Sequence, residues 1–458
     1  MSSDKGSFFG LDPAARAKLS SLIPGETPLE KTDSPPSISA GPKLDNSMIS
    51  FKEIPSYKQV LVMHAMTRKM GIQSPFNSCH ESISKQYTKI RGEDFLNYST
   101  YDYLGLNGHP RVNAAAAAAM EAFGTSAGAS RLVSGERPMH RTLEAGLAAN
   151  YDAEGALVFV SGHATNVSTL ATLLTSSDAV YHDALSHDSI IQGALLSGAH
   201  RYSFPHNDCD ALEKLLRQTR TRHRRAVIVT EGLFSMDGSI ARLPQLIALK
   251  KEYTAFLMVD EAHALGVLGA TGRGSFEHFG IAAGEVDIWM GTLSKTLCSC
   301  GGFIAGDGAL IELLRFRAPG FVYSVGMSPP LAAASAAALG LMREEPERVR
   351  RLAALSLYFL EEARRRGLNT GYAEGYGVIP VIVGSSLVAG LLSARLFERR
   401  INVMPIIFPV VEEGAARLRF FLSSVHEEEQ IRYVLDVLVE ELEKARDAAD
   451  SMREGTGA

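Results

Sequence analysis

The chain has little cysteine, with four among 458 residues, and this limits the metal and disulfide chemistry open to it. Cys79 and Cys209 are isolated in the sequence. Cys298 and Cys300 stand too close together for a routine zinc pair, and no second pair accompanies them. We therefore expect free thiols in a reducing cytoplasm and no metal site.

The chain also lacks any stretch of about 20 consecutive apolar residues, so the sequence predicts no membrane span. Its first residues, MSSDKGSFFG, do not have the basic-then-apolar order of a signal peptide. A net charge of −5 gives no reason to expect nucleic-acid binding. With 46% hydrophobic residues, the composition is that of an ordinary globular protein of two or three domains.

Residues 1–50 are rich in Ser, Pro, Gly and charge and poor in apolar runs, which is typical of a disordered tail or a linker. One exception is LDPAARAKLSSLI (11–23), where Asp12 and Pro13 fit the N-cap and the first position of a short helix. We expect this segment to be an N-terminal extension of the folded protein.

Short apolar runs stand out in the middle of the chain, and polar or glycine residues follow them. The clearest are ALVFV (156–160), AVIVT (226–230), FLMVD (256–260), VDIWM (286–290) and GGFIAG (301–306). Runs that are apolar on both faces are typical of buried parallel strands, and helix-like spacers lie between several of them. The sequence predicts an α/β fold with a mostly parallel sheet, whose ligands lie at the carboxyl ends of the strands.

The pattern changes after about residue 330, where long charged helices accompany the short strands VIPVIVG and LRFFLSS. We interpret this part as a smaller α+β domain. The predicted organisation is an N-terminal arm (51–110), a large domain that holds the ligand (111–335) and a C-terminal small domain (336–458).

Asp260 and Lys295 carry the strongest chemical signal. Asp260 ends a predicted strand, where a carboxylate is able to keep a bound pyridine nitrogen protonated. Lys295 follows 35 residues later (295 − 260) in GTLSKTLCSCGG, among hydroxyl residues and glycines that suit a phosphate. A desolvated lysine forms Schiff bases. The alternatives are that Asp260 only caps the next helix and that Lys295 is a solvated loop residue.

Weaker signals follow other predicted strands. Ser161, Gly162 and His163 precede a helical pattern, and a helix N-terminus favours anions. His187 stands where an imidazole is able to stack on a flat ring, and Ser235 lies on a loop within reach of a ring hydroxyl. Each of these residues also fits an ordinary capping or surface position.

Arg417 and Arg419 alternate along a predicted strand in ARLRFFLSS and therefore point to the same face. One arginine held bidentately is the usual anchor for a substrate carboxylate. The alternative is a pair of surface salt bridges.

The order and spacing of these motifs resemble the α-oxoamine synthases, a family of fold-type I enzymes that use pyridoxal 5′-phosphate (PLP). This family includes serine palmitoyltransferase, 8-amino-7-oxononanoate synthase and 2-amino-3-ketobutyrate CoA ligase. The resemblance runs from about Asp94 to His426. It is carried by STYDYLGLNGHP (99–110), FGTSAGASRLVSGERPMHRTLE (123–144), VFVSGHATN, ALSHDSI, TEGLFSMDG, VDEAHALGVLGATGRG (259–274), GTLSKTLCSCGGF and ARLRFFLSSVH.

The resemblance implies the fold of an aspartate-aminotransferase-like PLP transferase and a decarboxylative condensation. A small amino acid (serine, glycine or alanine) reacts with an acyl thioester of coenzyme A or of an acyl-carrier protein. The products are an α-aminoketone, CO2 and a free thiol. The resemblance also implies a homodimer with active sites at the subunit interface.

The resemblance implies a role for each site residue. Lys295 forms the Schiff base with PLP and exchanges the proton at the substrate Cα, Asp260 pairs with the pyridine nitrogen, and His187 stacks on the ring. The further implied contacts are His263 and Ser235 at the ring hydroxyl, Ser161, Gly162, His163, Thr292 and Ser294 at the phosphate, Ser324 at the phosphate of the neighbouring subunit, and Tyr101 and Arg419 at the substrate.

Three positions depart from the pattern of the family. Asp102 stands where asparagine is common, and an aspartate near a substrate carboxylate is unfavourable unless it is turned away or paired. His163 replaces the commoner Phe or Tyr, and YSVGMSPP differs from the usual YSTS-type segment. These departures leave the amino acid and the acyl donor open.

Other functions share part of this signal. A fold-type I transaminase or retro-aldol lyase would keep Lys295 and Asp260, and a catalytically silent partner subunit would be expected to lack the lysine. Residues 11–23 resemble the linker helices of polyketide and peptide synthetase systems, which favours a carrier-protein thioester as the donor. A tail without any role is the alternative.

Overall fold

The computed structural model describes residues 49–58, 60–61 and 76–455 of the chain. The chain divides into two compact units, residues 1–66 and 67–458. In the described part of the first unit, the 3-10 helix η3 (Phe51–Glu53) precedes a helical turn that begins at Pro55. The predicted helix at residues 11–23 and nearly all of the predicted extension lie outside the described residues.

The second unit is built on a seven-stranded sheet with the strand order β3-β9-β8-β7-β6-β4-β5. The strands are β3 (Gly155–Phe159), β4 (Ala179–Asp183), β5 (His200–Phe204), β6 (Ala226–Glu231), β7 (Phe256–Asp260), β8 (Ile288–Thr292) and β9 (Gly302–Gly306). Neighbouring strands are parallel except at β9, which runs antiparallel to both β3 and β8. The sheet is therefore mostly parallel, as the sequence predicts.

Alternate side chains of each central strand enter two different hydrophobic cores. In β6, Ile228 belongs to one core and Val227 and Val229 to the other. In β7, Val259 and Met258 divide in the same way. Burial on both faces explains why these strands read as continuous apolar runs rather than as alternating ones.

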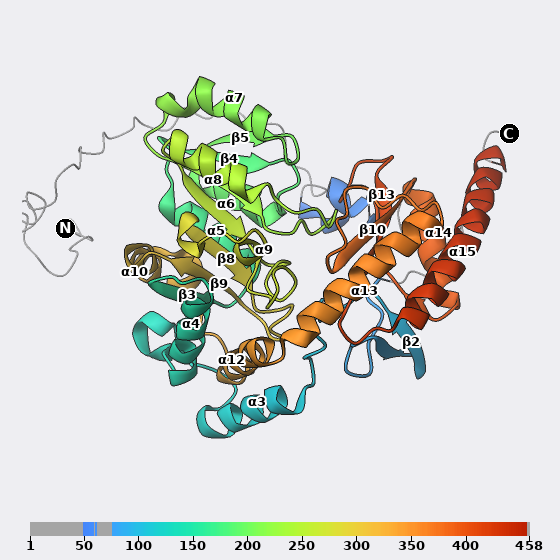
Figure 1. Cartoon of the computed structure of the whole chain (residues 1–458), viewed down its shortest axis with the longest axis horizontal. Coiled ribbons are helices and arrows are strands. Elements are labelled where there is room, and N and C mark those ends of the chain that lie inside the picture. The colour runs from blue at the N-terminus through green and yellow to red at the C-terminus, as the bar shows by residue number, and fades with distance from the viewer. Residues whose placement is uncertain (1–48, 59, 62–75, 456–458) are drawn as a thin grey trace, which may run out of the picture. The chain divides into compact units, whose positions relative to one another are not determined.

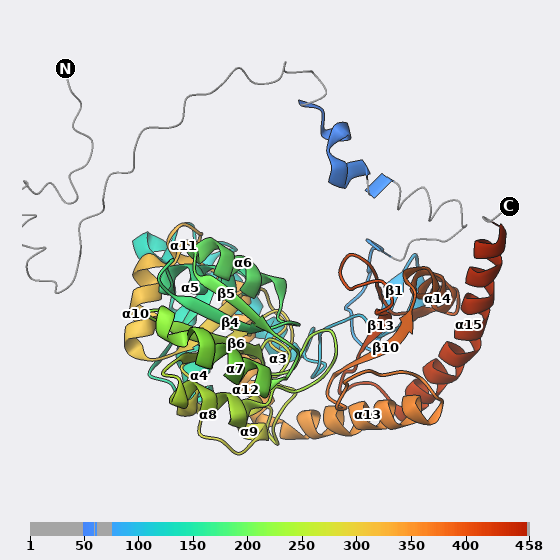
Figure 2. The same cartoon turned by 90° about the horizontal axis from the view of Figure 1, so that it is seen from above.

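Helices cover both faces of this sheet, so the unit has the layered α/β fold that the sequence predicts (Figure 2). One face packs against α5 (Gly162–Leu173), α6 (Asp188–Ser197), α10 (Gly308–Arg317) and α11 (Pro319–Val322). The other packs against α4 (Pro138–Asn150), α7 (Cys209–Thr219), α8 (Leu243–Glu252) and α12 (Pro329–Glu344), and α12 also packs on α3 (Pro110–Phe123). Short helical turns are η4 (Arg131–Gly135), η5 (Arg220–Arg222), α9 (Ser275–His278) and η6 (Ala283–Glu285).

The C-terminal part of the chain contributes two small sheets. One joins β10 (Val378–Gly384), β13 (Ala416–Phe421) and β12 (Pro405–Ile406) in antiparallel order. The other joins β1 (Tyr87–Ile90) and β2 (Glu93–Asn97) to β11 (Ile401–Asn402). Residues before position 100 therefore hydrogen-bond with residues beyond position 400.

Three long helices accompany these small sheets (Figure 1). Helix α13 (Pro346–Arg365) follows α12 and packs on α15 (Glu428–Gly455), and α14 (Ser386–Glu398) lies against both α15 and β13. The predicted domain boundaries stay predictions. The predicted boundary at residue 335 falls inside α12, which spans both of the proposed domains.

Four of the five apolar runs coincide with observed strands, and their ends differ from the strand ends by at most one residue. The fifth, VDIWM, is shifted, because β8 begins at Ile288 rather than at Val286. The Asp287 carboxylate accepts hydrogen bonds from Lys250 and from the amide of Leu257, which fixes it at the entry to the strand. No helix of the described residues is long and apolar enough to cross a membrane.

Candidate active site

The carboxyl ends of the central parallel strands bring two buried acidic side chains together. Asp260, the last residue of β7, is 4% exposed and lies opposite Glu231, the last residue of β6. Thr292 ends β8, the next strand of the sheet. Residues of three separate motifs, among them the predicted site residues Asp260 and Thr292, therefore meet at one edge, as expected for a mostly parallel sheet.

Hydrogen bonds from the protein fix the Asp260 carboxylate. Its Oδ1 accepts from the amide of Ala262 at 2.9 Å, and its Oδ2 accepts from Nδ2 of Asn166 at 2.8 Å. The Asp260 side chain stabilises the turn that follows β7; no helix of the described residues begins there, so the alternative that it caps the next helix does not apply. A buried carboxylate held in this way is well suited to pair with a protonated ring nitrogen.

Lys295 lies on the loop that follows β8, with its Nζ 5.7 Å from the ring centre of Tyr101. Burial lowers the pKa of Lys295 to about 8, although the nearby Asp260 and Glu231 act in the opposite direction and favour the charged amine. Arg419 adds to the lowering. A lysine with this pKa is neutral far more often at pH 7 than an exposed lysine, which is what Schiff-base formation needs.

Helix α5 begins beside the hydroxyl groups of the Lys295 loop and forms a close cradle. Ser161 is the N-cap of α5, and the Oγ1 of Thr292 lies 2.8 Å from the Oγ of Ser294. A Cβ atom on Gly162 would lie 3.0 Å from the Oγ1 of Thr292, and one on Gly302 would lie 2.7 Å from the Cα of Gly162. The glycines keep open a space lined by hydroxyl groups at a helix N-terminus, which suits a phosphate group.

The other residue of this motif, His163, is exposed on the first turn of α5. Its imidazole makes no hydrogen bond within the described part of the chain, and its side-chain role stays a prediction.

His187 is the N-cap of α6, and its side chain is exposed. Its Nδ1 lies 2.7 Å from the Oγ of Ser189 and accepts a hydrogen bond from the amide of the same residue at 3.3 Å. Withdrawal of part of the ring from water lowers the pKa of His187; Asp260 opposes this change, and Lys295 adds to it. The geometry leaves the Nε2 side of the ring available to a ligand.

His263 is 6% exposed and hydrogen-bonds to Tyr103 rather than to Ser235. Its Nδ1 lies 2.6 Å from the hydroxyl oxygen of Tyr103, and its ring stacks at 6.2 Å on Phe421. Burial and the neighbouring Lys295 lower its pKa well below the ordinary value. The shared contact of His263 and Ser235 with a ring hydroxyl stays a prediction.

The structure separates the two arginines of β13 by their partners. Arg417 forms a buried ion pair with Asp237 at 2.6 Å. Arg419 donates to the carbonyl oxygen of Ser235 at 2.8 Å and lies over the ring of Phe421, but its buried Nε has no hydrogen-bond partner in the described part of the chain. Arg417 therefore has a structural partner, whereas Arg419 keeps a donor available for a carboxylate.

Tyr101 and Asp102 are neighbours in sequence but face different environments. The ring of Tyr101 lies edge-on to Phe421 at 4.7 Å, close to the amine of Lys295. The carboxylate of Asp102 accepts from the backbone amides of Leu106 and Asn107, at 2.8 and 3.1 Å. Asp102 thus stabilises a turn, and the conflict with a substrate carboxylate that the sequence raises does not arise.

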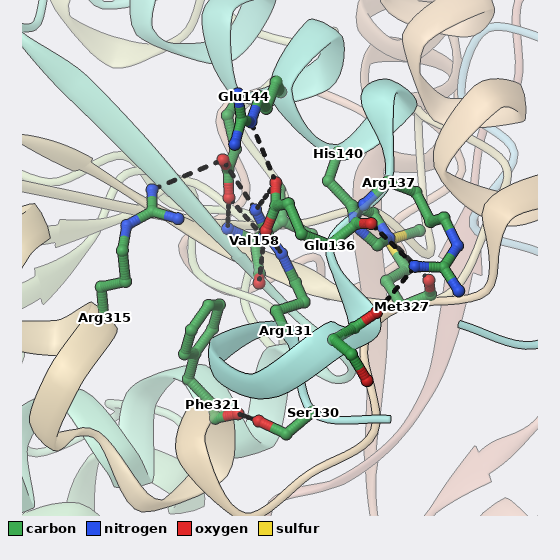
Figure 3. Close-up of polar contacts among 12 residues, drawn as sticks. Ser130, Arg131, Glu136, Arg137, His140, Glu144, Val158, Arg315, Phe321 and Met327 are labelled. Atoms are coloured by element: carbon green, nitrogen blue, oxygen red, sulfur yellow. Dashed lines mark hydrogen bonds and ion pairs between the residues drawn. The ribbon is translucent and has the colours of Figure 1, made fainter. Parts of the chain in front are cut away.

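Ser324 lies on the loop between α11 and α12, and no hydrogen bond joins it to the site residues above within the described part of the chain. Its neighbours Tyr323 and Val325 are 86% and 50% exposed. Contacts on both sides hold this loop in place. The Oγ of Ser130 donates to the carbonyl of Val322 at 2.8 Å and lies 3.5 Å from that of Phe321 (Figure 3). His140 contacts the carbonyl of Met327 at 2.7 Å, on the other side of Ser324.

Arg131 fixes the turn that supplies these contacts. It lies in the π-helical turn η4 and bridges Glu144 at 2.5 Å and Glu136 at 2.9 Å, with its side chain almost completely buried (Figure 3). Glu144 in turn accepts from the amide of Val158 in β3 at 2.9 Å. The GASRLVSGE segment therefore ties the Ser324 loop to the sheet.

Reasoning from the sequence missed four buried residues of the site. They are Tyr103, Asn166, Ser189 and Glu231. All four stand inside segments that carry the resemblance, but none has a catalytic residue type in a diagnostic spacing. The available signal was that a polar residue on the buried side of a helix or at a strand end needs a partner.

Together these groups fit PLP on the observations of this structure. The cradle at α5 matches a phosphate, the Asp260 carboxylate matches a protonated pyridine nitrogen, and the amine of Lys295 matches an aldehyde. The unpartnered Nε of Arg419 remains for a substrate carboxylate.

Comparisons with known proteins identify the family of the chain. Residues 93–438 match the family model described as aminotransferase class I and II. The chain is 39% identical over 350 residues to 8-amino-7-oxononanoate synthase 1 of Bacillus velezensis, covering 76% of this chain and 89% of that protein. It is 43% identical over 364 residues to 8-amino-7-oxononanoate synthase of Geobacter sulfurreducens, covering 78% and 92%. Serine palmitoyltransferase of Sphingomonas wittichii has a similar structure, with a TM-score of 0.81 and 27% identity over 86% of this chain and 98% of that one.

Proposed function

The chain belongs to the aminotransferase class I and II family and, within it, to the PLP-dependent α-oxoamine synthases. We propose that it catalyses a decarboxylative condensation of serine, glycine or alanine with an acyl thioester. The new carbon–carbon bond joins the amino acid Cα to the acyl carbon, and the thiol leaves. The carboxylate of the amino acid leaves as CO2, and a proton replaces it at Cα.

Each side chain of the site has a task in this reaction. Bound PLP supplies the electron sink that stabilises negative charge at Cα. Lys295 holds the cofactor and moves the proton at Cα, and Asp260 keeps the ring nitrogen protonated. His187 packs on the ring, and Arg419 orients the substrate carboxylate beside Tyr101.

The observation that carries the proposal is the position of Arg419. Its guanidinium is oriented by the Ser235 carbonyl and keeps an unpartnered Nε. It lies over the ring of Phe421, which contacts the ring of Tyr101, and the amine of Lys295 lies over that second ring. These positions support the assignment of Arg419 as a carboxylate anchor near the amine that we propose acts at Cα. This is the requirement for an enzyme that takes an intact amino acid.

Release of labelled CO2 tests the proposal. Purified protein with PLP receives glycine, alanine or serine labelled at the carboxyl carbon, with and without an acyl thioester. We expect label to leave only when the thioester is present, and the best amino acid identifies the substrate. Transfer of the amino group without loss of label would instead favour a transaminase, and Lys295→Ala should abolish every turnover.

Arg419 and Arg417 provide a matched pair of variants. Arg419→Lys loses the planar fork that binds a carboxylate, and we expect the KM for the amino acid to rise by about tenfold or more. Arg417→Lys keeps its ion pair with Asp237 and should leave KM near the wild-type value. Equal effects of the two variants would contradict the assignment of the anchor.

The names of the relatives bear on the amino acid. An 8-amino-7-oxononanoate carries a methyl group on its amine-bearing carbon, as alanine would supply, whereas the name of the structural neighbour specifies serine and a palmitoyl group. The 39–43% identity to the former supports testing alanine first.

The acyl donor is proposed to be the thioester of a carrier protein, with coenzyme A as the alternative. The support is the resemblance of residues 11–23 to linker helices. Equal turnover of acyl-CoA and acyl-carrier substrates, together with unchanged rates after deletion of residues 1–50, would remove that support.

The working protein is proposed to be a cytoplasmic homodimer, in which Ser324 contacts the phosphate bound by the neighbouring subunit. Four free cysteines agree with a reducing compartment. Mixed dimers test the shared site, because a Lys295→Ala subunit paired with a Ser324→Glu subunit restores one intact site. Activity that never exceeds that of the two separate variants would exclude the exchange.

A further inference from the structure

A continuous chain of hydrogen bonds links Asp260 to His187 through two buried side chains. The Nδ2 of Asn166 donates to the Oδ2 of Asp260 at 2.8 Å and to the Oγ of Ser189 at 2.9 Å. The same Ser189 oxygen lies 2.7 Å from the Nδ1 of His187. Asn166 is 1% exposed and Ser189 is completely buried, so water does not compete for these contacts.

The donors in this chain fix where its protons lie. The carboxylate of Asp260 only accepts, so both hydrogens of the Asn166 amide point outward to Asp260 and Ser189. The Ser189 oxygen thus accepts from Asn166, and its own hydrogen is free to point to His187. The backbone amide of Ser189 also donates to Nδ1 of His187 at 3.3 Å. Two donors therefore meet at Nδ1, which must carry a lone pair.

Close packing of α5 on α6 holds the bridge in register. Gly193 of α6 leaves room for the approach, since a Cβ there would lie only 2.9 Å from the carbonyl oxygen of Asn166 and 3.1 Å from the Cα of Val167. The backbone of Asn166 is therefore fixed by helix packing and not only by its side-chain contacts.

We propose that Asn166 is a positioning residue that, through Ser189, holds His187 neutral with its single proton on Nε2 and couples this state to the carboxylate of Asp260. The inference deepens the proposed function. The group that packs on a bound ring, His187, and the group that pairs with its nitrogen, Asp260, then act as one unit. His187 then keeps its proton on Nε2, and this N–H is available to donate a hydrogen bond to the ligand.

The electrostatic surroundings of His187 agree with a neutral ring. Partial burial lowers its pKa, the carboxylates of Asp260 and Asp188 oppose this change, and the neighbouring Lys295 and His163 act in the same direction as burial. The hydrogen bonds at Nδ1 act beside these groups, because a second proton on the ring would place an N–H against the Ser189 amide.

Titration of His187 in the cofactor-free protein tests the inference. Histidine labelled with 13C and 15N gives the pKa and the tautomer by NMR, and His187→Gln identifies the signal. We expect one tautomer, protonated at Nε2, in the wild type. Asn166→Leu and Ser189→Ala should give mixed tautomers and raise the protonated fraction at a given pH by about tenfold, which is one pKa unit.

Matched variants distinguish a role of Asn166 in positioning His187 from a role only in packing α5 against α6. Asn150 on α4 is equally buried and also has an unpartnered Oδ1, so Asn150→Leu should leave the titration of His187 unchanged. Ser189→Thr keeps the hydroxyl and should restore the tautomer. If Asn166→Leu does not fold, Asn166→Ala takes its place.

A wild-type titration in both Asn166 variants and in Ser189→Ala would overturn the inference. This readout uses protein without PLP or substrate, so it does not depend on the reaction. Failure of the CO2 assay would therefore remove the proposed function without deciding the role of Asn166, and the reverse also holds.

Discussion

The lowered pKa of Lys295 gives a quantitative prediction for the cofactor-free protein. Burial takes the pKa of this amine from 10.5 to about 8. At pH 7 the neutral fraction then rises from roughly one in 3,000 to about one in 11, an increase on the order of 300-fold. Only the neutral amine attacks an electrophile, so Lys295 should react faster than exposed lysines by a similar factor, within the limits of access.

The perturbation that tests this reasoning is Asp260→Asn. The Asp260 carboxylate is the largest of the influences that favour the charged amine, so its removal should shift the reactivity midpoint of Lys295 to a pH below 8. Trace acetylation between pH 6 and 11, followed by peptide mass spectrometry, measures the midpoint. Exposed lysines in the same digest serve as the internal reference.

Two results would refute the argument. A wild-type midpoint near 10.5 would mean that burial does not control the amine. A midpoint that rises in Asp260→Asn would mean that the carboxylate does not stabilise the charged form. Because the assay needs neither cofactor nor substrate, either outcome concerns the geometry of the site alone.

Three further predictions follow from buried contacts. Gly162→Ala places a Cβ 3.0 Å from the Oγ1 of Thr292 and should weaken PLP binding at least about tenfold in fluorescence titration; unchanged affinity would contradict the cradle. Glu144→Ala leaves the buried Arg131 without one partner and should cost about 3 kcal/mol or more in urea unfolding, whereas a loss below about 1 kcal/mol would mean that Glu136 suffices. Burial raises the pKa of Glu231 to about 8, so its contribution to stability is complete below pH 4.5 and is lost as the pH rises through 8. Melting curves of Glu231→Gln should therefore fall less between pH 6 and 9 than those of the wild type, and parallel curves would contradict the raised pKa.

The fold was accessible from the sequence because its sheet is buried on both faces. Strands such as β6 and β7 have no polar position to interrupt the apolar run, and their lengths exclude helices. The boundary of β8 was not accessible. Asp287 belongs to the strand entry because of contacts with Lys250 and Leu257, which the local sequence does not contain.

Some residues of the candidate site could also be predicted from the sequence, and others could not. Asp260 and Lys295 were accessible because their residue types limit the chemistry and a family pattern supports them. Asn166 was not, since an asparagine in the first turns of a helix has many ordinary explanations. Only the fold brings it to Asp260, which is 94 positions away in the chain. The alternation along β13 alone does not separate Arg417 from Arg419; the family resemblance favoured Arg419, and the structure adds that Arg417 is paired with Asp237.

Helix α5 contributes residues to both ends of the site, so it sets the distance between the two groups that would contact the ligand. Its first residues line the proposed phosphate cradle, and Asn166, one turn later, donates to the carboxylate of Asp260, the proposed partner of a ring nitrogen. Four residues of α-helix advance by about 6 Å, and this distance is fixed by backbone hydrogen bonds rather than by flexible loops. A displacement of α5 along its axis would move both recognition points together, whereas a tilt would change their separation. The close approach of α6 to α5 at Gly193 resists that tilt. One rigid helix therefore fixes the separation of the two recognition points and with it the length of ligand that fits.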